Sequence, residues 1–186
     1  MLTAKEAILG TTTQPAAGTI ETVVRRAPGS TFFTITYTLT GARMTVTDAG
    51  AGGSFGTLSL LDLPQTGVVW LGCRQNYTAI VGATALTTGA GDAVLAIGVG
   101  STAIAAAADG VLAAANRDIG GNVAVTQSGN TGSGTAHTAS NLAVDGTATA
   151  TKINLNVSGT AATVDATSTL DITGTITVAG VLLGDD

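Results

Sequence analysis

Large apolar side chains alternate with threonines along residues 31–40, where the apolar positions are Phe33, Ile35, Tyr37 and Leu39. Because successive side chains of a strand point to opposite faces, this two-residue period predicts a strand with one apolar face and one hydroxyl face. Gly41 follows, and residues 43–47 repeat the pattern. That second run is either the hairpin partner of the first or its extension past a bulge.

The same period recurs along most of the chain. Alternating runs occupy residues 58–63, 68–81, 93–99, 122–126, 153–157 and 170–178, with an interruption expected near residues 74–76. About eight to ten short strands separated by glycine-containing turns are typical of a β-sandwich or jelly roll. The sequence therefore predicts an all-β fold: a single jelly-roll-like β-sandwich over residues 19–186, with Trp70 in its core, preceded by an N-terminal arm and linker over residues 1–18.

Two segments depart from the strand pattern. Residues 104–116 are rich in alanine and fit one helix of about three turns, but Asp109 and Gly110 in the middle favour a turn, since an interior glycine costs about 1 kcal/mol in a helix. Residues 128–140 are almost all small and polar, and we expect a low-complexity loop. Residues 89–92 predict a further turn.

The N-terminal arm has the signals of a short helix. Thr3 and Glu6 have the spacing of a capping box, and Gly10 is a stop signal. A helix of this length is marginal alone and would gain order by docking on a neighbouring subunit. The candidate contacts to such a partner are Leu2, Lys5, Ile8, Leu9, Arg25 and Arg26.

Composition narrows the classes of partner. Charged residues make up 10% of the 186 residues, against about 25% in an ordinary domain, while apolar residues reach 45%. The formal net charge is −5, which disfavours nucleic acid because phosphate binding depends on clustered Lys and Arg. Apolar runs are too short to span a bilayer, so no membrane partner is expected.

Cysteine usage and the first residues bear on the compartment. Cys73 is the single cysteine, which excludes an internal disulfide and a cysteine-based zinc site. Lys5 and Glu6 interrupt the first apolar stretch, which therefore lacks the form of a secretory signal. We expect a soluble chain made in a reducing compartment.

Catalytic motifs are weak. Residues 52–56 match Gly-x-Ser-x-Gly around Ser54, but a strand pattern follows where a nucleophile elbow needs a helix, and the only histidine, His137, lies in the predicted loop. His137 also has no neighbouring metal ligands in the sequence. We therefore predict no enzyme, no catalytic, metal or cofactor-binding residue and no cofactor, with a Ser54-dependent hydrolase as a remote alternative.

The chain nevertheless carries a family resemblance. Residues 54–64, 68–72 and 91–98, which read SFGTLSLLDLP, VVWLG and GDAVLAIG, resemble structural proteins of tailed-bacteriophage virions. So do residues 143–146, 152–157 and 174–178, together with Gly184 and Asp185 near the end of the chain. The similarity extends over roughly residues 20–186.

The resemblance implies a jelly-roll-like capsid decoration, or cement, protein. Such a protein would be made in the bacterial host cytoplasm, bind the exterior of the phage head, and clamp adjacent major-capsid subunits against the pressure of packaged DNA. Its partners would be the major capsid protein and itself, as a homodimer or homotrimer. Another virion component, such as a head fibre, spike or tail protein, is the alternative. A carbohydrate-binding β-sandwich is disfavoured because aromatic residues are only 3%.

Overall fold

The protein is all-β. The structure, a computed structural model, describes residues 12–63, 67–82, 93–106, 110–128, 131–139, 143–144, 151–160 and 167–184. Its strands are β1 (Thr19–Arg25), β2 (Phe32–Asp48), β3 (Ser54–Asp62), β4 (Gly67–Gly82), β5 (Ala93–Gly100), β6 (Asn122–Ser128), β7 (Thr131–Ala139), β8 (Ala143–Val144), β9 (Lys152–Gly159) and β10 (Ser168–Gly184). Two 3-10 turns, η2 (Gly50–Gly52) and η4 (Ala114–Asn116), are the only helical elements within those ranges.

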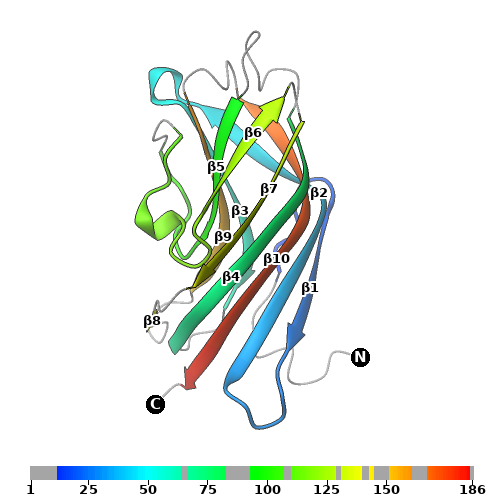
Figure 1. The fold of residues 1–186 in the computed structure, drawn as a ribbon, viewed down its shortest axis with the longest axis vertical. Coiled ribbons are helices and arrows are strands. Elements are labelled where there is room, and N and C mark those ends of the chain that lie inside the picture. Colours follow the sequence, from blue (N-terminus) through cyan, green and yellow to red (C-terminus); the bar gives the residue numbers. More distant parts are fainter. Residues whose placement is uncertain are drawn as a thin grey trace.

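The strands form one antiparallel sheet that nearly closes on itself. The order is β1-β2-β10-β4-β7-β6-β5-β9-β3, and β3 returns to β2 through the pairs Thr47–Phe55 and Asp48–Ser54. The short β8 extends the sheet beside the start of β4. Figure 1 shows β1, β2, β10 and β4 side by side at the end of the molecule that holds both labelled termini, while β3, β5, β6 and β9 lie toward the other end.

Strand β2 confirms the alternation and settles the choice at Gly41. Phe33, Ile35, Tyr37 and Leu39 are buried, and beyond Gly41 the buried positions are Ala42, Met44 and Val46. The inward set therefore slips by one residue at Gly41, whose φ of 56° is in the left-handed region. Residues 43–47 are the extension of the same strand past a bulge, and not its hairpin partner.

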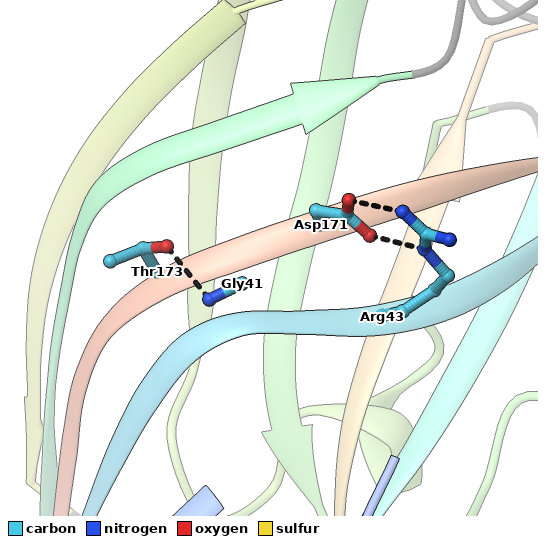
Figure 2. A network of polar contacts seen from close by, with 4 residues as sticks. All are labelled: Gly41, Arg43, Asp171 and Thr173. Atoms are coloured by element: carbon cyan, nitrogen blue, oxygen red, sulfur yellow. Dashed lines mark hydrogen bonds and ion pairs between the residues drawn. The ribbon is translucent and has the colours of Figure 1, made fainter. Parts of the chain in front are cut away.

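Irregularities in three neighbouring strands line up at this bulge. The register of β10 shifts between Ile172 and Gly174, and that of β4 shifts beside it. Thr173 joins the strands, because its hydroxyl accepts a hydrogen bond from the Gly41 N–H at 3.0 Å (Figure 2). Its carbonyl accepts one from the Thr78 hydroxyl at 3.3 Å. Bulges increase local twist, and Figure 1 shows β2, β10 and β4 curving together.

One contiguous cluster of buried apolar side chains fills the inside of the sheet. Trp70 is fully buried, as predicted, and its ring meets that of Phe33 edge to face with centroids 5.8 Å apart. Cys73 is buried in the same cluster, and burial raises the pKa of its thiol to about 12. Two polar side chains there are hydrogen-bonded in sequence: the Tyr77 hydroxyl donates to Gln75 Oε1 at 2.7 Å, and Gln75 Nε2 donates to the Gly120 carbonyl.

The prediction of a loop at residues 128–140 is wrong for most of these residues. Strand β7 occupies Thr131–Ala139 and pairs with β4, so His137 lies on a strand, opposite Arg74. Its small residues have a packing reason: a Cβ at Gly134 would lie 2.8 Å from Val123 Cγ1.

The expected interruption near residues 74–76 is also wrong, because β4 continues through them, paired with β10 on one side and β7 on the other.

The alanine-rich segment contains no α-helix in its described residues, 104–106 and 110–116. Gly110 has a φ of 78°, which agrees with the turn interpretation. The first eleven residues, and with them Leu2, Lys5, Ile8 and Leu9, lie outside the described residues, as does the predicted turn at residues 89–92. Across the part of the chain that the structure describes, no helix has the length and apolarity needed to cross a membrane.

Candidate interaction surface

The outer side of β2 and β10 carries a row of threonines on each strand. We call the surface made by Thr34, Thr36, Thr38, Thr175 and Thr177 the threonine face; these side chains are partly or fully exposed. Thr36 lies opposite Thr177 and Thr38 opposite Thr175, and the hydroxyls of Thr36 and Thr177 are 3.2 Å apart. Cross-strand threonine pairs stabilise a sheet, and β-branching leaves few side-chain rotamers. The face is therefore uncharged, hydroxyl-rich and rigid.

Apolar side chains border this face at the end of the molecule near the termini. We call Phe32, Val69, Leu71, Val181 and Leu183 the apolar tip. Val181 lies between Phe32 and Val69 in the sheet register, so the cluster is continuous across three strands. Phe32 is 45% exposed, Leu71 43% and Leu183 59%. Adjacent exposed apolar residues on one surface are typical of an interaction site.

Charged groups lie around the threonine face and not within it. Glu21 and Arg25 are exposed on β1, while Arg74 and His137 are exposed opposite each other on β4 and β7. Beyond the bulge at Gly41, Arg43 Nε and Nη2 each donate a hydrogen bond to one carboxylate oxygen of Asp171 at 2.7 Å (Figure 2). The hydrogen bond from Arg43 holds the pKa of Asp171 below its ordinary value.

Of the candidate contact residues predicted from the sequence, the structure describes only the two arginines, and it separates them. Arg25 ends β1 and is exposed on the same side of the sheet as the threonine face. Arg26 Nε donates a hydrogen bond to the Ser30 carbonyl, so this guanidinium stabilises the turn between β1 and β2. Sequence reasoning noticed the threonine alternation but did not select those threonines as a site.

The opposite outer face, on β5, β9 and β3, is covered by the chain itself. We call residues 101–106 and 110–121 the covering segment. Asn156 on β9 holds it in place: Asn156 Oδ1 accepts hydrogen bonds from Thr57 Oγ1 at 2.8 Å and the Ile104 N–H at 3.0 Å, and Nδ2 donates to the carbonyls of Thr102 at 3.0 Å and Asn116 at 2.8 Å. All four hydrogen-bonding positions of this fully buried amide are therefore satisfied.

Small residues on β5 allow the covering segment to lie close to the sheet. A Cβ at Gly100 would lie 2.3 Å from the carbonyl carbon of Asn116, and one at Gly98 would lie 2.8 Å from Arg117 Cβ. Between segment and sheet, Ala96, Ile104 and Leu112 form a second small apolar cluster against Phe55. This face therefore serves the fold, whereas the threonine face remains open to a partner.

The Gly-x-Ser-x-Gly motif does not form a nucleophile elbow. Ser54 is fully buried at the first position of β3, and a strand follows it. In the sheet order, β9, β5 and β6 separate β3 from β7, which carries His137. Nucleophilic serine needs a base within hydrogen-bonding reach, and these residues do not have that arrangement. Among the described residues, no three His, Cys, Asp or Glu side chains are grouped so as to hold a metal ion.

Comparisons of the chain with protein-family models, curated proteins and solved structures found no match. The structural part of any inference about function therefore depends on the surfaces themselves: one outer face is closed by the covering segment, and one open face of threonines ends in apolar side chains.

Proposed function

We propose that this chain is a structural virion protein that binds the outer surface of a tailed-phage head and clamps adjacent major-capsid subunits. The observation that carries the proposal is the threonine face with its adjoining apolar tip: an uncharged surface of partly or fully exposed threonines beside exposed apolar side chains. The resemblance of the sequence to phage virion proteins supplies the identity of the partner.

The chemistry of the face suits a permanent contact. Threonine hydroxyls cost far less to desolvate than charged groups, and short β-branched side chains have little rotamer entropy to lose on binding. Each exposed apolar side chain of the tip would contribute roughly 25 cal/mol for every Å² removed from water. A surface of this kind gains affinity from shape and apolar contact more than from ion pairs.

Stabilisation of the head follows from linkage. A protein that binds the assembled shell better than free subunits shifts the equilibrium toward assembly. If one oligomer contacts several lattice sites, its effective concentration multiplies a modest single-site affinity. The net charge of −5 favours the exterior of the head over contact with the packaged genome. Jelly-roll-like packing of the sheet and synthesis in the host cytoplasm belong to the same proposal.

The test is occupancy on heads that lack the protein. Arginines at the centre of the threonine face, in the double variant T36R/T177R, should lower occupancy at least about tenfold, because two buried unpaired charges would have to be desolvated. The control is A105R/A113R, which adds the same charge at exposed positions of the covering segment. Bound protein is measured on purified particles.

Equal occupancy of the two double variants would contradict the proposed docking face. Labelling of wild-type protein on intact particles tests the role itself. An even coat over the shell supports decoration, whereas label confined to the tail or to one vertex would contradict it in favour of a fibre, spike or tail component.

A further inference from the structure

The outer side of β4 and β7 continues the sheet surface next to the threonine face. It carries four polar side chains that we call the donor patch: Arg74, Asn76, Thr135 and His137. In the sheet register, Arg74 lies between Thr177 of β10 and His137 of β7, and in the next row Asn76 lies between Thr175 and Thr135. Arg74, Thr135 and His137 are exposed, and Asn76 is partly exposed. The patch is therefore open to solvent and continuous with the threonine face.

Every side chain of the donor patch can donate hydrogen bonds. The Arg74 guanidinium has five N–H groups in a planar fork, the Asn76 amide has two, and the Thr135 hydroxyl and His137 imidazole each have at least one. The bordering Thr175 and Thr177 add two more hydroxyls, and none of the six side chains is a carboxylate. An ionised carboxylate only accepts hydrogen bonds, so it is the chemical complement of this set.

Arg74 has no counter-charge within the part of the chain that the structure describes. The ion pairs there are Arg43–Asp171 and Lys152–Asp62. On the side of the threonine face, two strands, β10 and β2, separate Arg74 from β1, which carries Glu21. An exposed guanidinium beside an imidazole, in a chain of net charge −5, does not serve the fold through an ion pair.

We propose that the donor patch binds a carboxylate of the protein on which the threonine face docks, an aspartate or glutamate side chain of a major-capsid subunit. The inference rests on the proposed function and deepens it. Arg74 would hold the two carboxylate oxygens through paired N–H···O bonds, since the guanidinium fork matches that geometry. His137 and Asn76, on either side of Arg74 in the patch, would donate to the remaining lone pairs.

A protein carboxylate fits the patch better than a nucleic-acid phosphate. Binding to a phosphate backbone depends on several clustered Lys or Arg side chains, whereas Arg74 is the only one in the patch and the chain has a net charge of −5. A single carboxylate needs only one guanidinium.

The position of the patch at the border of the threonine face indicates its role. Hydroxyl and methyl groups give an interface area but little direction, whereas one ion pair at its border fixes how the docked sheet is turned. Charges at the rim of an interface also act mainly on the rate of association and on its salt dependence. The donor patch should therefore orient and speed docking, while the threonine face and apolar tip provide most of the contact.

Salt dependence of binding to purified heads tests the inference. At about 0.1 M salt the double variant R74Q/H137Q should bind about tenfold more weakly than wild type, because charge-assisted hydrogen bonds are lost. At about 1 M salt, where the Debye length is about 3 Å, the two proteins should bind almost alike. R117Q, which removes the same formal charge at an exposed position of the covering segment, should match wild type at both concentrations.

R74K separates the charge of Arg74 from its planar fork. Lysine keeps the charge but cannot make the paired contact, so R74K should bind with an affinity between those of wild type and R74Q/H137Q. All these positions are exposed, and the variants should keep the circular dichroism spectrum of the wild type.

Three results would overturn the inference while leaving the docking face, as tested by T36R/T177R, intact. The first is equal binding of wild type and R74Q/H137Q at low salt, and the second is a loss that persists unchanged in high salt. The third is binding of a DNA duplex by the wild-type chain that R74Q/H137Q lacks, which would assign the patch to phosphate. A wild-type chain that does not bind heads at all would overturn the inference together with the proposed function.

Discussion

The two outer faces of the sheet differ in what their small side chains permit. On β5, Gly98 and Gly100 leave no side chain outside the sheet, and the backbone of the covering segment approaches within the space that a Cβ would need. On β2 and β10, threonines such as Thr36 and Thr177 hold hydroxyl and methyl groups outward. Glycine makes a face that its own chain can close, whereas threonine makes one that stays solvated and open.

This contrast separates stability from function. Substitutions beneath the covering segment should cost folding free energy and leave the open face intact. Substitutions on the threonine face should do the reverse. The comparison fails if substitutions on the two faces change the free energy of unfolding to the same extent, or change occupancy on phage heads to the same extent.

The largest effect is expected at Gly100. In Gly100→Val the new Cβ would overlap the backbone of residues 115 and 116, so the covering segment must move. Overpacking against backbone should lower the free energy of unfolding by about 3 kcal/mol. Urea unfolding measures this. Ala105→Val, on an exposed position of the same segment, is the control and should remain within about 0.5 kcal/mol of wild type.

Asn156→Ala should destabilise the fold almost as much as Gly100→Val. It removes both acceptor and both donor positions of a buried amide, leaving the Ile104 N–H and the Thr102 and Asn116 carbonyls without that partner. The expected loss is about 2–3 kcal/mol. Amide hydrogen exchange at Ile104 should also become faster. Asn122→Ala, at an exposed position, is the matched change, and a similar loss there would show that Asn156 has no special role.

The T36R/T177R variant should lose much less stability, within about 1 kcal/mol of wild type, because both side chains are partly exposed on the outer side of the sheet, opposite the buried set. Thermal unfolding measures it alongside the occupancy experiment. A loss as large as that of Gly100→Val would mean that the threonine face serves the fold.

The smallest effect is expected at the exposed Arg43–Asp171 pair. The pKa of Asp171 is lowered in the folded chain, so the pair stabilises the fold above the ordinary carboxyl pKa near 4, and this contribution is lost as pH falls through the folded value. Asp171→Asn should therefore be slightly less stable than wild type at pH 7. The urea midpoints of the two proteins should converge once the pH is below the folded-state pKa of Asp171, and a difference that grows in acid would contradict the assignment.

Much of this architecture was predictable because it depends on local alternation. The inward set from Phe33 to Leu39, the buried Trp70 and the all-β class follow directly from side-chain period. Strand β7 was missed because glycine, serine and threonine also make loops. What holds it is the ladder with β4, a non-local pairing that single-sequence patterns do not contain.

The candidate surface was predictable only in part. The threonines of β2 and β10 were visible as an alternating set, but their meeting across the sheet, Thr36 against Thr177, depends on the register of strands far apart in sequence. Arg26 looked like half of a basic pair and instead stabilises a turn through the Ser30 carbonyl. The role of Asn156 was hidden for the same reason, because its partners come from two other segments.

The most direct test of the central claim is an electron-microscopy map of the phage head at a resolution that places side chains. The account predicts this chain on the outside of the shell, with Thr36, Thr177 and Phe32 against major-capsid subunits. A map in which the chain lies inside the head beside the genome, or binds the shell with the threonine face turned to solvent, would contradict it.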